Sequence, residues 1–597
     1  MNAPTSWKKL APDLFLFADA CNIYLLRDGD RAIAVDFGTG RWLSCLDQIG
    51  VAQLEHVVLT HAHRDQCCGL YQQPHSSFVV HAPTGDSDLL EPAPLNQFWH
   101  SYQSNGCPSS YAAPRLPLEE VRTDMAADSE RLIGPARFCG IATPGHTRGA
   151  LSYIVEWRGR HLAFCGDAVH AGGTLHQPYH LEWDHWTPEG ALAAWYGLER
   201  LRYCYFDLLL PSHGAIVEQQ PRSCVTQTQK KLLRLIRAKG SVCVGEKNRW
   251  LDLEPMASTG ASRVLPHLYH FGGNSFLLIG KNGTGMVVDP TLGSIHQLEP
   301  LMREIGLERI EVTTASHYHL DHSDALNQVR AHYNAAVWLH PWVAAPICDR
   351  NRYDLPWLPA ESIVPDRLLP ETGAFRWDAY RFEIRPFPGQ TWWHCAFDTL
   401  IDNRHVLFSG DNFQPPTRWN GTGGFCAFNG SRFSRGFAPS ARAASAINPA
   451  IVCNGHGNIY TFARSHYRRI LHWAARTEKT LEALCPSPVW MADYDCRATH
   501  WEPFVSQARP RQTLRLTLVH HNYQTREVTL LVSPCGPHGW SPTPARRRMR
   551  VPAGKSRRLN FTLQLPRNVD KGRYLIAADV ELDGHPQGEV CVALIDI

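Results

Sequence analysis

The feature that most constrains this chain is an internal duplication. The segment THAHRDQCCG at residues 60–69 returns as SHYHLDHSDA at residues 316–325. Three further pairs of motifs follow in the same order in both halves: TPGHTRG (143–149) with FPGQTWW (387–393), FCGDAV (164–169) with FSGDNF (408–413), and LPSHG (210–214) with CNGHG (453–457). Agreement of this many ordered motifs predicts two copies of one fold.

The stretch before the first motif is also shared. LAPDLFLFADACNIYLLRDGDRAIAVDFGTG opens the first copy, and VLPHLYHFGGNSFLLIGKNGTGMVVDPTLG opens the second. Apolar and aromatic runs separated by DGD or KNG predict strand, tight turn and strand. A helical stretch and a buried-type strand follow, and the end of that strand meets the histidine cluster.

The repeat sets the predicted domain organisation. Unit 1 spans residues 1–245 and includes predicted helices at TPEGALAAWYGLERLR and QTQKKLLRLIRAK. Residues 246–261 form a linker, and unit 2 spans residues 262–500 and ends in the helical SHYRRILHWAARTEKTLEAL. We expect an α/β architecture in both units because strand and helix patterns alternate.

The C-terminal module, residues 501–597, has a different pattern. Runs such as RQTLRLTLVHHN, EVTLLVSP, RRLNFTLQLP and GRYLIAADVEL alternate apolar and polar residues at strand length. They predict an all-β sandwich that resembles immunoglobulin-like or fibronectin-type modules. The basic run PARRRMR (544–550) is expected to be a solvated loop between strands.

Net charge, cysteine content and apolar runs limit the classes of partner and compartment that we expect. The formal net charge is only +3, so charge gives no reason to expect nucleic acid or a membrane as a partner. The 18 cysteines include no CxxC pair, which favours reduced and mostly buried thiols, Cys67 and Cys68 among them, over a disulfide or zinc-ribbon scaffold. Without an apolar N-terminal run or a membrane-length apolar segment, we expect a cytoplasmic protein acting on a small molecule. Homo-oligomer formation stays open.

Histidines and acids follow the predicted strands of unit 1. His61 and His63 are two residues apart, so both imidazoles can point to one side at a strand end. His146, Asp167 and His213 each lie beside glycine after an apolar run. Imidazoles and carboxylates at one sheet edge are the ligands of a transition-metal site. We therefore expect these groups to converge on a cation.

These motifs resemble those of the metallo-β-lactamase superfamily: HxHxD, PGHT, GD and SHG, in that order, after a strand–turn–strand start. The resemblance implies an αββα sandwich, here duplicated, with one or two divalent metals per unit. Zinc is the first choice, and iron or manganese are alternatives. Members hydrolyse lactams, thioesters, lactones or phosphodiesters, and some are iron oxygenases or oxidoreductases. The fold is therefore better specified than the substrate.

In unit 1 the resemblance implies one complete and one damaged ligand set. The residues matching the first ion are His61, His63 and His146, with Asp167 as the bridging acid, and those matching the second are Asp65 and His213. Gln66 stands where the remaining histidine of the second set belongs. Since an amide oxygen is a weak neutral ligand beside imidazole, we expect a well-held first metal and a weak or absent second one.

In unit 2 the missing ligand belongs to the first set instead of the second. The matching residues are His317, His319, Asp321, His322, Asp411 and His456. Gln390 replaces the histidine of PGHT, so the second set is intact and the first is damaged. His394, four residues later, is either a substitute ligand or a structural hydrogen-bonding residue.

The predicted function is a metal-dependent hydrolase of a small ester, thioester or lactone. A bound metal lowers the pKa of its water and supplies hydroxide at neutral pH. Unit 1 is the expected catalyst, with Asp65, whose counterpart is Asp321, orienting or deprotonating the attacking water. The alternatives are a non-haem iron oxidoreductase, or a partly non-catalytic binding protein with one degenerate unit.

Overall fold

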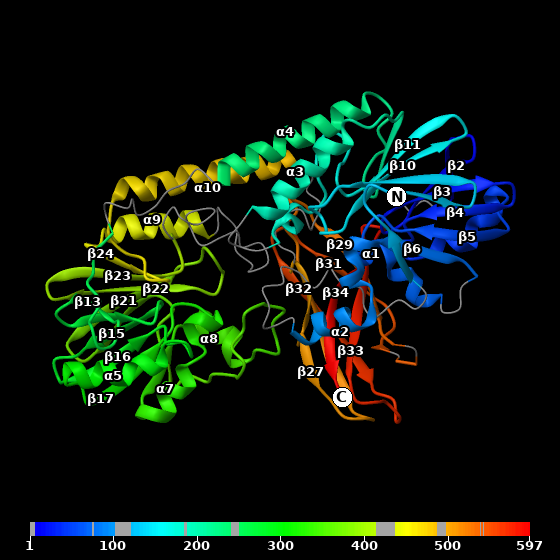
Figure 1. The fold of residues 1–597 in the computed structure, drawn as a ribbon. Coiled ribbons are helices and arrows are strands. Elements are labelled where there is room, and N and C mark those ends of the chain that lie inside the picture. The colour runs from blue at the N-terminus through cyan, green and yellow to red at the C-terminus, as the bar shows by residue number, and fades with distance from the viewer. Residues whose placement is uncertain are drawn as a thin grey trace.

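The computed structural model describes residues 6–73, 77–101, 121–183, 188–239, 250–413, 436–485, 497–537, 539–540 and 542–597. Two similar α/β units and an all-β C-terminal module make up the chain (Figure 1). The predicted duplication and the predicted change of architecture at the C-terminus are both confirmed.

Unit 1 is built on two facing sheets. Its first sheet runs antiparallel from β1 to β4 and parallel from β4 to β7. Its strands are β1 (Lys8–Ala11), β2 (Leu14–Ala18), β3 (Asn22–Asp28), β4 (Arg31–Val35), β5 (Gln53–Val58), β6 (Val79–Pro83) and β7 (Val121–Met125). The second sheet has the order β12-β11-β10-β9-β8, with strands β8 (Glu130–Ile133), β9 (Ala136–Ala142), β10 (Leu151–Trp157), β11 (Arg160–Gly166) and β12 (Leu208–Pro211).

Helices cover the outer faces of these sheets. They are α1 (Arg64–Cys67), α2 (Pro92–Ser101), α3 (Glu189–Leu201), α4 (Pro221–Lys239) and the 3₁₀ helix Arg41–Ile49. Between the sheets, Tyr24 and Val35 share one core with Tyr153 and Phe164. Burial of both sheet faces explains why β3, β11 and β12 read as nearly continuous apolar runs.

Unit 2 repeats this plan. Its first sheet contains β13 (Ser262–Leu265), β14 (Leu268–Phe271), β15 (Ser275–Ile279), β16 (Thr284–Val288), β17 (Arg309–Thr314), β18 (Ala336–Leu339) and β19 (Arg367–Leu368). The second contains β20 (Gly373–Trp377), β21 (Tyr380–Pro386), β22 (Cys395–Ile401), β23 (Arg404–Gly410), β24 (Ile451–Asn454) and β25 (Ile459–Thr461). The helices are α5 (Ile295–Ile305), α6 (Leu320–Ser323), α7 (Leu326–Tyr333), α8 (Pro341–Cys348), α9 (Phe437–Ile447) and α10 (Arg464–Leu484).

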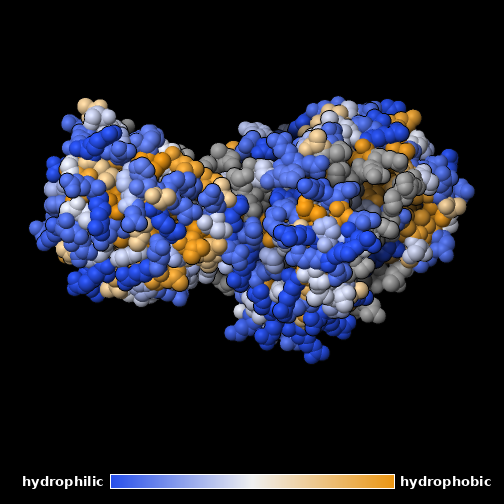
Figure 2. Space-filling view, turned by 90° about the horizontal axis from the view of Figure 1, so that it is seen from below, coloured by the Kyte–Doolittle hydropathy of each residue, from blue (hydrophilic) through white to orange (hydrophobic). Residues whose placement is uncertain are grey.

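The two units meet through their long last helices. Helices α4 and α10 pack on each other where the two units join (Figure 1). The backbone N–H of Leu175 in unit 1 donates to the carbonyl of Leu484 at the end of α10, over 2.9 Å. Seen from below, the surface divides into two lobes (Figure 2).

The C-terminal module is a two-sheet β structure. One sheet has the order β26-β28-β32-β30, and the other has the order β27-β34-β33-β29-β31. The strands are β26 (Thr499–Glu502), β27 (Val505–Gln507), β28 (Thr513–His521), β29 (Val528–Cys535), β30 (Pro542–Thr543), β31 (Arg547–Val551), β32 (Ser556–Gln564), β33 (Arg573–Leu582) and β34 (His585–Asp596).

The expectation of a loop at PARRRMR is wrong for its second half. Residues Arg547–Val551 form β31, which pairs with β29. Met549 and Val551 are buried while Arg548 and Arg550 are exposed, so the run alternates like a half-buried edge strand. Charged side chains on such a strand suit the edge of a sheet.

The module contacts both units. Its strand β34 packs on α1, the short helix that carries Asp65. Phe504 donates a backbone hydrogen bond to the carbonyl of Arg352 in unit 2, and Arg573 donates to the carbonyl of Trp99 in unit 1. Within the described residues, no helix is both long and apolar enough to cross a membrane.

Candidate metal centre and active-site cleft

The first histidines of unit 1 lie in the loop that follows β5. The hydroxyl of Thr60 lies 3.0 Å from Nδ1 of His61, so Nε2 of that ring is left to face the interior. Thr60 itself is fixed by Asp36, which accepts its backbone N–H (2.8 Å) and its hydroxyl (3.0 Å). The end of a parallel strand thus presents His61 in a defined orientation.

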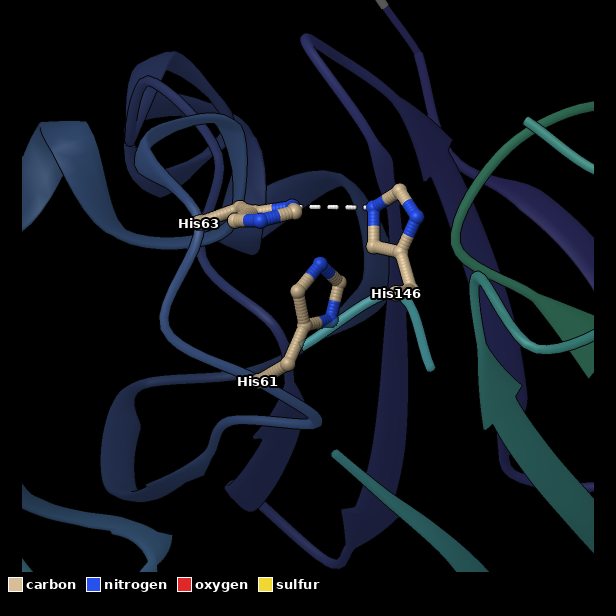
Figure 3. Close-up of side chains that lie close together, drawn as sticks. All are labelled: His61, His63 and His146. Carbon is tan, nitrogen blue, oxygen red and sulfur yellow. Dashed lines mark hydrogen bonds between the residues drawn. The ribbon is translucent and has the colours of Figure 1, made fainter. Parts of the chain in front are cut away.

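His146 comes to the same place from the loop between β9 and β10. His61, His63 and His146, here called the histidine trio, are all buried and point toward one another (Figure 3). Nδ1 of His63 lies 2.9 Å from Nε2 of His146. One ring nitrogen from each of the three lies within 4.8 Å of the others. The predicted convergence of these residues is therefore present in the structure.

Asp86 joins the two loops that carry the trio. Its carboxylate accepts the N–H of Ala62 (2.9 Å), the hydroxyl of Thr147 (2.8 Å) and the N–H of Gly149 (2.7 Å). A Cβ on Gly149 would lie 2.1 Å from the carbonyl carbon of Gly85, so only glycine permits this approach. The buried carboxylate therefore positions histidines that are far apart in sequence.

Two buried carboxylates share one imidazole beside the trio. His213 places Nδ1 2.8 Å from Asp167 Oδ1 and Nε2 2.9 Å from Asp65 Oδ2. Burial alone would lower the pKa of His213, but the charges of Asp167 and Asp65 outweigh it and raise that pKa well above its usual value. Two carboxylates with a single protonated partner leave net negative charge in a buried place, which a cation would balance.

The pKa values of the trio and of the carboxylates are shifted so that their charges differ. Burial, with His146 adding to it, lowers the pKa of His61 to about 3. Burial would raise the pKa of Asp167, but His213 and His146 hold it well below its usual value. A neutral His61 beside an ionised Asp167 matches the protonation states that metal binding requires.

Two atoms of this centre lack hydrogen-bond partners among the described residues. Nε2 of His61 and Oδ2 of Asp167 are both buried and 3.6 Å apart, and Oδ2 also lies 3.3 Å from Nε2 of His146. Neither of the first two atoms has a hydrogen bond of good geometry within the described residues. Buried polar atoms are rarely left unsatisfied because each costs about 1–3 kcal/mol. The donor set and these two atoms fit a divalent metal ion.

Gln66 turns its amide toward Asp65. Its Nε2 donates to Oδ2 of Asp65 over 3.1 Å. Its Oε1 is buried without a hydrogen-bond partner among the described residues, and an amide oxygen is a weaker metal ligand than imidazole. A weak second-ion position built from Asp65, Gln66 and His213 stays a prediction.

Three histidines that the sequence analysis did not single out surround the centre. His170 lies 3.2 Å from Oδ1 of Asp167, and His176 stacks on His213 with ring centroids 3.9 Å apart. His180 packs on His63 with centroids 4.3 Å apart. Their signal was the spacing HAGGTLHQPYH, three histidines in eleven residues directly after the GD motif.

In unit 2 the predicted ligands form two overlapping groups. His317, His322 and Asp411 offer ligand atoms within 4.8 Å of one another, and so do Asp321, His322 and His456. Nε2 of His322 is 3.1 Å from Asp411 Oδ1, and Nε2 of His456 is 3.0 Å from Asp411 Oδ2. Asp321 is 43% exposed at its side chain.

In unit 2, the amide of Gln390 occupies the position of the missing PGHT histidine. Nε2 of Gln390 donates to Asp411 Oδ2 over 2.8 Å. His394 is fully buried and stacks on His317 at 4.8 Å with an interplanar angle of 11°. Neither it nor His319, which packs against Trp357, belongs to either group of ligand atoms found in the described part of unit 2.

A cleft of about 1000 Å³ opens beside the unit 1 centre. Unit 1 lines it with His176, His213 and Lys231. Ala483 at the end of α10 adds a wall from unit 2, and a hairpin segment of the C-terminal module, residues 585–587, adds another. All three parts of the chain therefore enclose one cavity.

The thiols beside Asp65 do not open on this cleft. Cys67 and Cys68 are buried and lie 3.3 Å and 3.4 Å from the carbonyls of His63 and Gly38. Burial raises the pKa of both well above the usual value. The prediction that they pack inward is confirmed.

The chain is similar to several known proteins. The chain is 27% identical over 147 residues to hydroxyacylglutathione hydrolase GloC of Haemophilus influenzae, a match that spans 24% of this chain and 66% of that protein. A metallo-beta-lactamase of Cronobacter sakazakii with a HARLDQ motif shares 17% identity at a TM-score of 0.31, over 40% of this chain and 96% of that one. A class B3 di-zinc metallo-beta-lactamase from an Alaskan soil metagenome shares 14% at a TM-score of 0.29, over 39% and 92%.

The family assignment comes from the two repeated units. The metallo-beta-lactamase superfamily model matches residues 16–213 and, separately, residues 268–456. Each match begins in the first sheet and ends at the last histidine motif of its unit, and together they cover well over half of the 597 residues. The protein thus belongs to the metallo-beta-lactamase superfamily, with two units of that fold in one chain.

Proposed function

We propose that unit 1 is the catalytic centre of a metal-dependent hydrolase that cleaves small acyl esters, with thioesters as the first substrate class. The observation that carries this proposal is the pair of buried, unsatisfied atoms His61 Nε2 and Asp167 Oδ2, set among the histidine trio. Their arrangement is costly unless a cation completes it.

The residues that would hold the cation are His61, His63, His146 and Asp167. When bound, zinc, or alternatively iron or manganese, supplies Lewis-acid polarisation and a nucleophilic water at neutral pH. Asp65 is the chain's own acceptor for a proton from the attacking water. Its Oδ1 is buried without a hydrogen-bond partner among the described residues, while Oδ2 is occupied by His213 and Gln66. His213 thereby fixes the orientation of the free oxygen.

The thioester class rests on the relative and on the cleft. Hydroxyacylglutathione hydrolase GloC is named for a thioester substrate, and its resemblance to this chain favours that bond type. Lys231 lines the cleft and offers a positive charge to an acidic acyl or thiol group. A cavity of this size accommodates a small molecule rather than a polymer.

Unit 2 supports the cleft in this proposal. Its Gln390 donates to Oδ2 of Asp411, so an amide that is already hydrogen-bonded stands at the position of the missing motif histidine. The end of its helix α10 forms part of the cleft wall. A structural role for unit 2 thus follows from its position, and its own ion site is a separate property.

The test is hydrolysis of a panel containing a hydroxyacylglutathione, a neutral oxygen ester and a lactone by protein purified without added metal. We expect thioester cleavage, loss of at least 100-fold in kcat/KM in His61→Ala/His63→Ala, and little change in the control His161→Ala, whose ring lies outside the centre. Unchanged turnover in the double variant would remove unit 1 as the catalyst. Tightly bound iron with oxygen uptake and no hydrolysis would replace the hydrolase with an oxidoreductase.

A further inference from the structure

Three half-buried histidines form a second group of ligand atoms beside the unit 1 centre. His170, His176 and His213, here called the outer histidine cluster, each offer a ring nitrogen within 4.8 Å of the others. Two of them lie in the segment after β11, and His213 follows β12. We propose that this cluster binds a divalent transition-metal ion, and that it replaces the second-ion position weakened by Gln66.

The geometry of the cluster suits an ion of this kind. Ligand nitrogens about 2.0–2.1 Å from a tetrahedral zinc lie about 3.4 Å apart. The nitrogens of the cluster are already within 4.8 Å of one another. Side-chain rotations that move each nitrogen by about an ångström would bring them to the spacing of a zinc site. His176 and His213 are stacked at 3.9 Å with their planes 15° apart, and His170 is nearly parallel to His176 at 5.4 Å. The three rings therefore lie side by side, and each has to turn for its nitrogen lone pair to point at one ion.

The cluster opens onto the cleft. All three of its histidines line the cavity of about 1000 Å³, so an ion has an entry path and room for water in the remaining coordination positions. Asp167 lies next to the cluster, 3.2 Å from His170 and 2.8 Å from His213. Its negative charge stabilises a nearby cation. Binding of the ion displaces a proton from His213 and replaces one of the two contacts of that ring with Asp65 and Asp167.

The sequence of the two units shows a compensating exchange. Unit 1 has Gln66 in the HxHxD motif and His170 three residues after Asp167. Unit 2 has His322 in that motif and Gln414 three residues after Asp411, although Gln414 lies outside the described residues. The unit that lacks the motif histidine thus carries a histidine in the later position.

Cobalt binding to the full chain tests the proposal, because Co²⁺ is visible by its d–d absorption. Apoprotein of the wild type, His170→Gln/His176→Gln and the control His161→Gln is titrated with Co²⁺ alone. We expect the double variant to lose about one equivalent of Co²⁺ per chain, and the control to keep the wild-type number. Equal stoichiometry and affinity in the wild type and the double variant would overturn the proposal.

A rescue variant separates lost ligands from lost folding. Introducing Gln66→His into the double variant restores the motif histidine, and we expect it to recover the missing equivalent. A double variant that unfolds at the wild-type temperature and is not rescued by Gln66→His contradicts the replacement. If the double variant is unstable, the single variant His176→Gln serves, and unchanged Co²⁺ affinity there also refutes the site. None of these readouts requires hydrolysis, so the cluster and the proposed reaction can fail independently.

Discussion

The guanidinium of Arg64 donates a 3.3 Å hydrogen bond to the carbonyl of Val590, a residue 526 positions away in the C-terminal module. Arg64 is fully buried and is the neighbour of Asp65 in α1. A Cβ on Gly588, also in β34, would lie 3.7 Å from the Cα of Asp65, at ordinary contact distance. The module therefore supports the backbone beside the histidine trio of unit 1.

Removing this contact should loosen the module. Arg64→Met keeps the apolar stem but leaves the Val590 carbonyl without this donor, and a buried hydrogen bond to a charged group contributes about 1.5–3 kcal/mol. We expect a lower unfolding temperature and faster proteolysis between unit 2 and the module. Thermal unfolding and limited proteolysis measure both effects. The exposed Arg404→Met is the control, and equal behaviour of the two variants would show that the contact is dispensable.

The cleft wall supplied by the module should affect substrate binding rather than chemistry. Gln587 lines the cleft from the module side, so Gln587→Ala should raise KM about threefold to tenfold through loss of about one hydrogen bond, with kcat nearly unchanged. Steady-state kinetics with the substrate found in the panel measures KM and kcat separately. Gln564→Ala, an exposed change in the same module, is the matched control. A fall in kcat with KM constant would refute a binding role.

Restoring the missing histidine of unit 2 should strengthen its ion site. Gln390→His replaces an amide that donates to Asp411 with an imidazole that can ligate. We expect Co²⁺ affinity of unit 2 to rise about tenfold or more, the scale on which changes around a metal alter affinity. Isothermal titration of the wild type, this variant and the exposed control Gln328→His provides the comparison. No gain over the control would mean that the side of unit 2 near His317 has lost more than one ligand.

The contact between unit 2 and the module should depend on pH. Burial alone would raise the pKa of Glu502, but hydrogen bonds from His500 and Arg558 and the charge of Arg352 lower it to about 2, from 4.5. A carboxyl whose pKa is depressed in the folded state stabilises the fold fully above pH 4.5 and loses that contribution as the pH falls toward 2.

Comparison with Glu502→Gln isolates this contribution. The wild type should unfold at a higher temperature than the variant at pH 7, and the difference should shrink as the pH falls from about 4.5 to 3. Differential scanning calorimetry over this range measures it. A difference that stays constant with pH would show that the charge of Glu502 does not stabilise the contact.

The sequence predicted much of this arrangement because the ligands come from the ends of buried strands. His61, His146 and Asp167 each follow an apolar run beside glycine or a short polar turn, so their order was sufficient to predict convergence. The helices α3, α4 and α10 were likewise visible in amphipathic runs. These signals are local and periodic.

What the sequence could not show depends on packing between distant segments. His176 reaches His213 only because the loop after β11 folds back, and no periodicity encodes that path. The insertion of Val590 and Gly588 against α1 joins parts of the chain with no shared motif. The cleft wall from the module follows from this docking and so was also beyond prediction.

The central claim is that the histidine trio of unit 1 and Asp167 hold a metal ion. Anomalous diffraction from crystals of the protein grown with Zn²⁺, recorded on both sides of the zinc edge, tests it most directly. The account predicts a strong anomalous peak within about 2.3 Å of His61 Nε2 and of a ring nitrogen of His63 and His146. Zinc bound elsewhere in the chain, with no peak among these three rings, would contradict it.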